Sequence, residues 1–471
     1  LTTRVVDLEE QEDLYQAAEE RRDDLLDAFT GGEDGRPPTP SELKAAIEAG
    51  REIIRSGELE EEPEPSPFER FRGPPTILKK GGLTPLLHAV RQGHHEAMVA
   101  LLDGGADVNK VSESDGTSPL LMATINGQFD AAVLLLERGA DPNLAATLNE
   151  VTPLWAAINS QWQPRTRYPQ PQERSLQETG YLQLAEALLE AGADPDARIS
   201  LHPWYLVYTG CGNGNCGLVD MRGSTAFWRA AYATDVEAMK LLAEHGADPH
   251  LPTTAGNMMS FSDYRRLQVV EELEEEAFQE KDVEAKAQAL RTARGDLPEE
   301  MQAEWPDSVV NADPDAYYEE IKEAWEHADS VAQAKPDPSG LPPVKEGDPA
   351  VYPIHAASGV GYGEGFAGNA HRHVPDGWME TVRYLVEELG ADVNMRDANG
   401  YTALHHAASR GDNEMIRYLV EMGADVTVVS RDGQTTADMA NGPVQRVSPF
   451  PETVALLERL GSMNNHNCQS C

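Results

Sequence analysis

Two short stretches of the chain carry cysteines at spacings that permit chemistry. Cys211 and Cys216 enclose four Gly and Asn residues, so the backbone between them can turn tightly and bring the two thiols together. Cys468 and Cys471 form a C-x-x-C pair at the end of the sequence. A disulfide within each pair is the first interpretation, and free thiols or ligands of a zinc site, which needs four, are the alternatives.

The C-x-x-C pair also invites a redox or haem interpretation. Thiol–disulfide enzymes hold such a pair at a helix N-terminus in a βαβ setting, and no such pattern surrounds Cys468. A haem attachment site needs a histidine after the second cysteine, so haem becomes credible only if the natural chain continues beyond Cys471 with His. We therefore regard a metal- or redox-linked function as the second hypothesis.

A second candidate for metal binding is the Gly-rich stretch 359–377. His371 and His373 lie two residues apart, so both rings project to one side of an extended segment, and Glu364 and Asp376 are nearby. We favour a surface loop whose histidines contact carboxylates over a metal site. The sequence contains no nucleophile elbow, phosphate loop, dinucleotide fingerprint or H-E-x-x-H motif, so we expect neither catalysis nor a cofactor.

The charge of the chain restricts its partners. Its 471 residues include 80 acidic and 38 basic side chains, a formal net charge of -42, which repels phosphate backbones and disfavours nucleic acid. No stretch approaches the roughly 18 consecutive apolar residues of a membrane span. The sequence begins at Leu1 without Met, and its paired cysteines suit an oxidising compartment. We expect export to the periplasm or the extracellular space, with the cytoplasm as the alternative.

The elements that must position these residues follow a repeat. Gly390-Ala391-Asp392 recurs as Gly423-Ala424-Asp425, 33 residues on, and between them lie a turn, a helix over 402–409, a break at Gly411 and a second helix. Thr402 is placed to cap the first helix and His405 to hydrogen-bond a neighbouring turn. This unit resembles an ankyrin repeat. A single such repeat cannot bury its apolar face, so neighbours must exist.

Seven such units follow one another in register, in an arrangement similar to ankyrin-repeat proteins of bacterial type with long insertions. The resemblance covers roughly 82–249 and 350–461, and it implies an all-α solenoid of about seven helix-turn-helix repeats. Trp155 and Trp228 stand where the family usually has histidine, so we expect each to lose a hydrogen bond to the neighbouring turn. Polar substitutions in the last unit suggest a cap.

Five segments follow from these patterns. They are a helical N-terminal extension with an acidic Pro-rich linker at 1–80, repeats one to four at 81–249, an acidic helical insertion at 250–349, repeats five to seven at 350–461, and a Cys-containing tail at 462–471. Apolar spacing predicts a helix over 8–29. Thr39-Pro40-Ser41-Glu42 predicts the start of a second helix. We expect these two helices to shield the first repeat.

The resemblance also implies where a partner would bind. Ankyrin proteins commonly contact partners through the groove formed by the turn tips and the first helix of each repeat, and the insertions flank both rims of that groove. The groove positions vary in chemistry here, and they are Leu83, Arg91, Gln92, Thr117, Ile125, Asn126, Ser224, Tyr232, Asn399, Tyr401, Ser409, Arg410 and Arg431. Tyr232, Tyr401 and Arg410 are the residue types that most often carry binding energy. The first hypothesis is therefore a non-catalytic scaffold for a protein partner, whose identity and stoichiometry the sequence leaves open.

Overall fold

The structure is a computed structural model of the chain. It describes residues 2–3, 5–30, 36–56, 79–163, 173–203, 219–256, 337–362, 371–442 and 448–467. The four cysteines, Glu364 and most of the acidic helical insertion expected at 250–349 lie outside the described residues.

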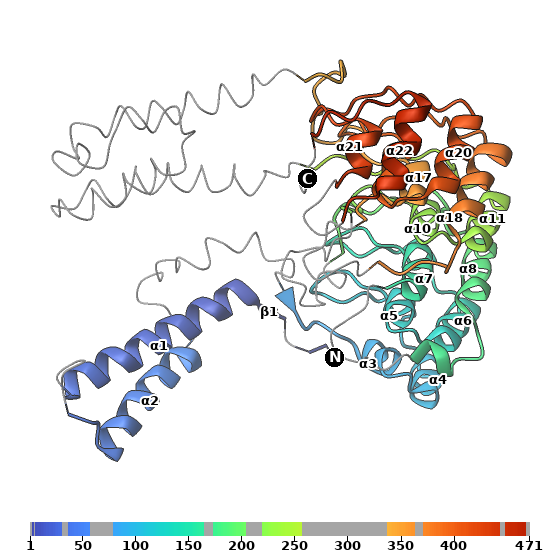
Figure 1. Ribbon diagram of the computed structural model, residues 1–471. Coiled ribbons are helices and arrows are strands. Elements are labelled where there is room, and N and C mark those ends of the chain that lie inside the picture. Colours follow the sequence, from blue (N-terminus) through green and yellow to red (C-terminus); the bar gives the residue numbers. More distant parts are fainter. Residues whose placement is uncertain are drawn as a thin grey trace, which may run out of the picture.

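Pairs of short helices stack one after another to form a curved solenoid (Figure 1). The pairs are α3 (Pro85–Arg91) and α4 (His95–Asp103), α5 (Pro119–Ile125) and α6 (Phe129–Glu137), α7 (Pro153–Gln161) and α8 (Tyr181–Glu190), α10 (Ala226–Tyr232) and α11 (Val236–Glu244), α17 (Pro353–Ser358) and α18 (Trp378–Arg383), α19 (Ala403–Ser409) and α20 (Asn413–Glu421), and α21 (Thr436–Ala440) and α22 (Pro451–Leu460). A 3-10 turn, η1 (Glu173–Leu176), precedes α8, and a π-helical turn, η2 (Tyr384–Glu388), continues α18. Each first helix contacts the first helix of the next pair, which confirms the expected repeat architecture.

The repeating sequence motif starts each first helix. Thr84 is the N-cap of α3, where its Oγ1 accepts a 3.1 Å hydrogen bond from the Leu87 amide, and Pro85 occupies the first turn. Thr152 caps α7 in the same way. The Gly-Ala-Asp motif follows the second helix of the first six pairs: Gly390 and Gly423 have φ of 72° and 94°, a left-handed conformation that costs glycine least. The caps and breaks predicted from the sequence are thus confirmed.

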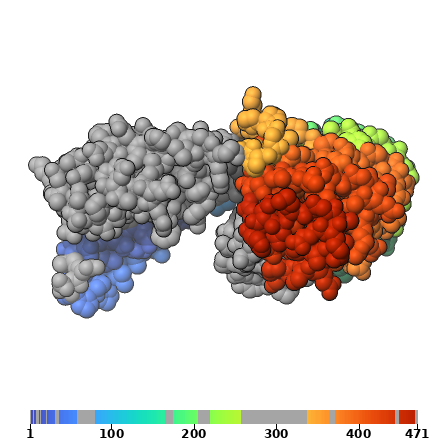
Figure 2. All heavy atoms as spheres, turned by 45° about the horizontal axis from the view of Figure 1, so that its top comes forward, coloured from blue at the N-terminus to red at the C-terminus, as the bar shows by residue number. Residues whose placement is uncertain are grey.

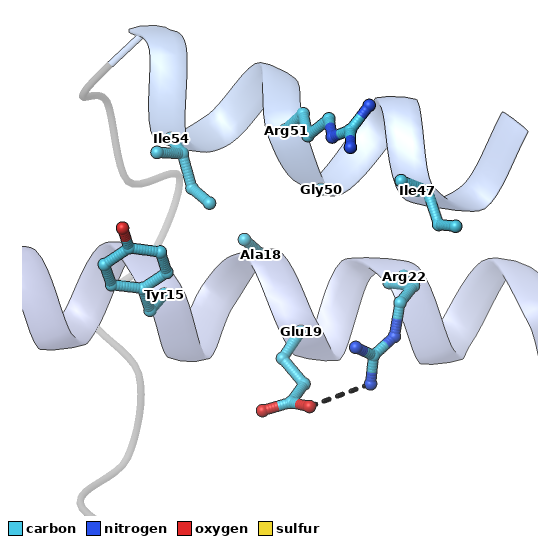
Figure 3. Close-up of a pocket in the computed structure, with 8 residues that line it drawn as sticks. All are labelled: Tyr15, Ala18, Glu19, Arg22, Ile47, Gly50, Arg51 and Ile54. Atoms are coloured by element: carbon cyan, nitrogen blue, oxygen red, sulfur yellow. Dashed lines mark hydrogen bonds and ion pairs between the residues drawn. The ribbon is translucent and has the colours of Figure 1, made fainter. Parts of the chain in front are cut away.

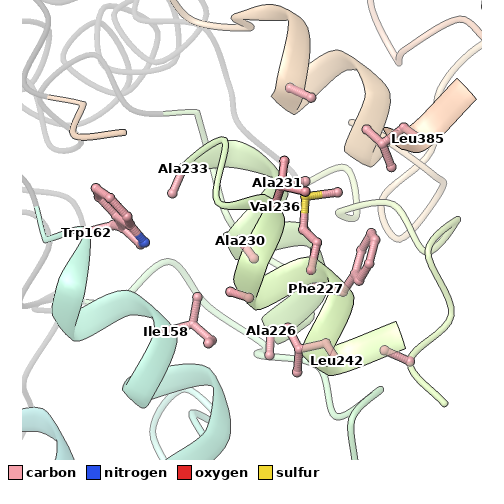
Figure 4. Close-up of a cluster of buried hydrophobic side chains, with 14 of the residues drawn as sticks. Ile158, Trp162, Ala226, Phe227, Ala230, Ala231, Ala233, Val236, Leu242 and Leu385 are labelled. Carbon is pink, nitrogen blue, oxygen red and sulfur yellow. The ribbon is translucent and has the colours of Figure 1, made fainter. Parts of the chain in front are cut away.

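Small residues allow the helices to approach closely. Figure 4 shows Ala226, Ala230 and Ala231 of α10 between the preceding and the following repeats, beside larger apolar side chains such as Ile158 and Leu385. All five belong to one buried cluster that runs through the stack. A larger side chain at the alanine positions would push neighbouring helices apart.

A ladder of side-chain hydrogen bonds joins successive repeats beyond their second helices. Asn394 donates from Nδ2 to the Gly423 carbonyl over 3.0 Å, and its Oδ1 accepts from the Asp425 amide over 2.8 Å. Asn109 and Asn143 form the same two bonds to their following repeats. This position therefore stabilises the interface between repeats rather than a single repeat.

The two tryptophans overturn one expectation. Trp228 donates from Nε1 to the Val351 carbonyl over 2.8 Å, and Trp155 donates to Ser224 Oγ over 3.0 Å. His355, at the equivalent position of its repeat, reaches the Met395 carbonyl over 2.9 Å. The prediction that tryptophan loses a bond to the neighbouring turn was wrong, because the indole N–H spans the same gap as an imidazole nitrogen.

Two helices precede the repeats. β1 (Val6–Asp7) pairs antiparallel with β2 (Lys79–Lys80), and α1 (Leu8–Thr30) and α2 (Pro40–Ser56) form a hairpin. The predicted capping box is present, since the Thr39 amide donates to Glu42 Oε2 over 2.8 Å. Figure 1 shows the hairpin extending away from α3, so it does not shield the first repeat as expected. The two helices pack on each other instead.

The two ends of the largest insertion pair with each other at its base. The Thr253 amide donates to the Val351 carbonyl over 2.9 Å, and the Ala350 amide donates back to the Thr253 carbonyl over 2.8 Å. Ala255 makes the same kind of exchange with 347–348. This clamp lets α10 contact α17 directly across the insertion. No helix within the described residues has the length and apolar content to span a bilayer.

Candidate protein-binding surface

Backbone hydrogen bonds connect the turn tips into one continuous edge. The Glu113 amide donates to the Gly82 carbonyl over 3.2 Å, and the Thr147 amide donates to the Asp115 carbonyl over 2.7 Å. The same link recurs near the other end, from the Arg431 amide to the Asn399 carbonyl over 3.0 Å. These bonds fix the spacing of the tips, and they hold the side chains beside them in a regular row.

The expected groove residues of the first two repeats are the most accessible. Arg91 and Gln92, at the end of α3, are exposed. Ile125 and Asn126 hold the equivalent places one repeat later and are half-buried, as is Leu83. Thr117 differs, because it is buried in its turn, where its amide donates to Ser112 Oγ over 3.0 Å.

The groove positions of the fourth repeat are buried. Tyr232 is 1% exposed, and the His371 ring stacks on it with centroids 3.9 Å apart. His371 belongs to the insertion of the fifth repeat, which crosses back over the fourth: the Val374 amide donates to the Ala233 carbonyl over 2.9 Å. Ser224 is fully buried, where it accepts from an indole. Neither Tyr232 nor Ser224 therefore belongs to the surface proposed below.

The expected contacts at the end of α19 are also largely enclosed. The Arg410 side chain is 7% exposed, pairs with Asp412 over 2.5 Å and lies 4.0 Å over the Trp378 ring. Burial lowers the pKa of its guanidinium, although the neighbouring carboxylate opposes the shift. Ser409 is buried and donates to the His406 carbonyl. Arg410 thus packs against α18 of the fifth repeat, and we leave both residues out of the proposed surface.

The segment that returns from the largest insertion occupies the last turn tips. Arg431 pairs with Asp337, and it donates to the Pro342 carbonyl over 2.6 Å and to the Ala398 carbonyl over 2.7 Å. In the space-filling view of Figure 2, the amber surface of this part of the chain adjoins the red surface of the last repeats. Arg431 therefore holds a segment of its own chain in this structure.

Asn399 and Tyr401 border this segment at the tip of the sixth repeat. Asn399 is exposed, and its amide donates to Asp397 Oδ1 over 2.9 Å. Tyr401 is half-buried and donates its hydroxyl to Gln434 Oε1 over 2.5 Å. Both remain candidates for partner contact.

Buried histidines and a carboxylate support the same tip from beneath. His406 Nε2 lies 3.0 Å from Asp397 Oδ2, and both side chains are almost fully buried. Burial opposes ionisation of Asp397, but the hydrogen bond from His406 helps to hold its pKa below the ordinary value. Burial lowers the pKa of His355 to about 4 and that of His405 to about 3. These three histidines are structural.

The two histidine rings of the described part of this loop, His371 and His373, pack against aromatic side chains. The rings of His371 and His373 are 5.4 Å apart, and burial lowers the pKa of His371 well below its ordinary value. His373 instead packs against Trp378, with centroids 4.5 Å apart. In the part of the chain that the structure describes, no three His, Cys, Asp or Glu side chains cluster in a way that could hold an ion.

The stack of helix pairs, with turn tips along one edge and Gly-Ala-Asp motifs along another, defines a helical repeat solenoid. The chain contains ankyrin repeats. Two family models match it, "Ankyrin repeats (many copies)" at 370–420 and "Ankyrin repeats (3 copies)" at 69–146.

Similar proteins match over short stretches. Protein phosphatase 1 regulatory subunit 27 of Mus musculus is 41% identical over 69 residues, which are 15% of this chain and 44% of that protein. The BCL-6 corepressor of Homo sapiens is 47% identical over 56 residues, 12% of this chain and 3% of that protein. Protein phosphatase 1 regulatory subunit 12A of Mus musculus is 38% identical over 71 residues, 15% and 7% of the two chains. The chain thus spans less than half of each relative, and the repeats together with these relatives support a protein-binding role.

Two surface residues were not predicted from the sequence. Glu113 and Thr147 are exposed at the tips of the first turns, next to Gly82 and Gly116. The glycine that recurs at the turns could have indicated these two positions, because Gly82 lies against Glu113 and Gly116 lies against Thr147, each at the tip of the following repeat.

Proposed function

We propose that this chain is a non-catalytic scaffold that binds a protein partner through the turn tips and first helices of its first repeats. One observation carries the proposal: Arg91 and Gln92 are exposed, whereas Ser224, Tyr232 and Arg410, in equivalent regions of later repeats, are buried against the chain itself. Exposed, chemically varied side chains on a rigid backbone edge are suited to recognition. A net charge of -42 favours a partner with a basic surface.

The test begins with affinity capture of partners from the native source by the full chain. The affinity of the captured partner is then measured for the double variant Arg91→Ala/Gln92→Ala. We expect a loss of at least about tenfold, because arginine often carries a large share of interface energy. The variant should keep its thermal stability, since both side chains are exposed.

Arg138→Ala is the matched control. Arg138 follows α6, on the second-helix side of the same repeats, and makes a surface ion pair with Asp103 over 2.9 Å. Its replacement should leave the affinity unchanged. Full affinity in the double variant, or an equal loss in the control, would mean that the partner binds elsewhere.

Localisation and cysteine chemistry are separate parts of the proposal. The paired spacing of the cysteines supports two local disulfides and export to an oxidising compartment. The metal- or redox-linked alternative depends on the same four residues, which lie outside the described chain. A count of free thiols distinguishes disulfides from free or metal-bound cysteines.

A further inference from the structure

The N-terminal hairpin leaves large apolar side chains uncovered. Tyr15 is 53% exposed and Ile54 is 39% exposed, whereas the buried residues of the crossing are Ala18, Ala46 and Gly50. Gly50 is required there, because a Cβ atom would lie 2.5 Å from the Ala18 carbonyl oxygen. The two helices therefore touch through their smallest residues, and the larger side chains beside the crossing remain exposed.

These side chains line a groove between the helices. Tyr15 and Ala18 of α1 face Ile47 and Ile54 of α2 across it in Figure 3, and the groove has a volume of about 300 Å³. A two-helix hairpin with so little buried apolar area is marginal in water, so covering this groove would stabilise it.

The hairpin that forms the groove is acidic overall, although the charged residues that line the groove itself are Glu19, Arg22 and Arg51. α1 contains nine acidic and two basic residues, whereas α2 contains three of each. Arg22, which lines the groove, already pairs with Glu19 over 2.9 Å and with Asp23 over 2.7 Å. Arg51 lies 3.3 Å from Glu48. The cations of the groove are thus offset by neighbouring carboxylates, and the excess charge of the hairpin is negative.

The net charge of each possible occupant of the groove determines whether α1 attracts or repels it. The segment 57–78 has six acidic and two basic residues, and the segment 257–336 has 21 acidic and eight basic residues. A second copy of the hairpin would bring the same negative charge as the first. Each of these would be repelled by α1, whereas a basic helix with one apolar face would be attracted and would bury the exposed side chains.

We propose that the α1–α2 groove binds a basic amphipathic helix of a partner protein. The apolar face of that helix covers Tyr15, Ile47 and Ile54, and the negative charge of α1 attracts its lysine or arginine side chains. This site lies outside the stack of repeats (Figure 1), so it does not depend on the surface proposed above.

The test uses three synthetic helical peptides of about 18 residues, long enough for five turns. The first has leucine on one face and lysine elsewhere, the second replaces lysine by glutamate, and the third replaces leucine by serine. Binding to the full chain is measured by fluorescence anisotropy at physiological salt. We expect the leucine–lysine peptide to bind at least about tenfold more tightly than either comparison peptide, since only it supplies both interactions.

Two variants locate the site. Tyr15→Ser and Ile54→Ser should each weaken binding of the leucine–lysine peptide about tenfold, as expected for loss of a buried anchor. Leu176→Ser is the control, because Leu176 is 78% exposed but lies in the third repeat. Circular dichroism should show unchanged helix content in Tyr15→Ser, whose side chain is the more exposed of the two.

Four outcomes would overturn the proposal. Equal binding of the serine–lysine peptide would indicate general attraction to an acidic chain. Wild-type affinity in both variants would place the peptide elsewhere. Self-association that Ile54→Ser abolishes would assign the groove to a second copy. Binding that appears only after 257–336 is removed would assign it to that segment.

Discussion

Asp235 joins the third and fourth repeats, and its replacement should be costly. The carboxylate is 2% exposed; its Oδ2 accepts from Trp162 Nε1 and from the Tyr181 hydroxyl, both over 2.8 Å, and its Oδ1 accepts from the Ala238 amide over 3.1 Å. In Asp235→Asn, an NH2 group replaces one of the two carboxylate oxygens, each of which accepts a hydrogen bond. Because the NH2 group is a donor, at least one buried donor loses its acceptor. At about 1–3 kcal/mol for each unsatisfied group, together with the loss of charge-assisted bonds, we expect a destabilisation of about 2–4 kcal/mol.

The assay is equilibrium urea unfolding at neutral pH, followed by circular dichroism. Asp425→Asn is the matched control, because Asp425 is exposed and accepts only from its own turn, at Thr427. We expect the control to lose no more than about 1 kcal/mol. Equal stability of the two variants, or an Asp235→Asn midpoint indistinguishable from wild type, would refute the assignment of Asp235 as an inter-repeat anchor.

Three further predictions concern pH, the largest insertion and the thiols. Burial lowers the pKa of His355 to about 4, so its neutral ring contributes fully to the free energy of unfolding above the unfolded pKa of roughly 6.5. This contribution falls as the pH is lowered, by about 2 kcal/mol at pH 5. The urea midpoint should fall over the same pH range, and His355→Gln should reduce this pH dependence. Replacing 257–336 by a short Gly/Ser loop, with 337–349 retained, should leave one cooperative thermal transition, whereas its loss would place the insertion in the core. Thiol titration of denatured, unreduced protein should find almost no free thiol, and four free thiols with stoichiometric zinc would contradict the disulfides.

Local motifs predicted the scaffold because each residue acts within its own repeat. Thr402, for example, caps α19, and Gly423 ends α20 in the left-handed conformation, as expected. These effects depend on backbone geometry over a few residues, which the sequence displays directly. The capping box at Thr39 was predicted for the same reason.

The accessibility of the candidate surface could not be predicted in this way. Tyr232 occupies a groove position by its place in the repeat, but it is buried because 371–374 crosses it from another repeat. Arg431 is engaged by the segment returning from the largest insertion. Both contacts depend on the path of long insertions, for which the repeat pattern contains no rule. Trp228 shows the opposite error, since a departure from the motif preserved the hydrogen bond.

The clamp between 253 and 351 has a consequence for folding on the ribosome. The Val351 amide donates to Thr253 Oγ1 across 98 residues, whereas the bond from Asp425 to Asn394 spans 31. Synthesis of α10 ends at Tyr232, whereas α17, which covers one surface of α10, begins 121 residues later at Pro353. At about 5–20 residues per second, that surface waits about 6–24 s for its neighbour. During that interval, the first four repeats of the nascent chain have an open apolar end.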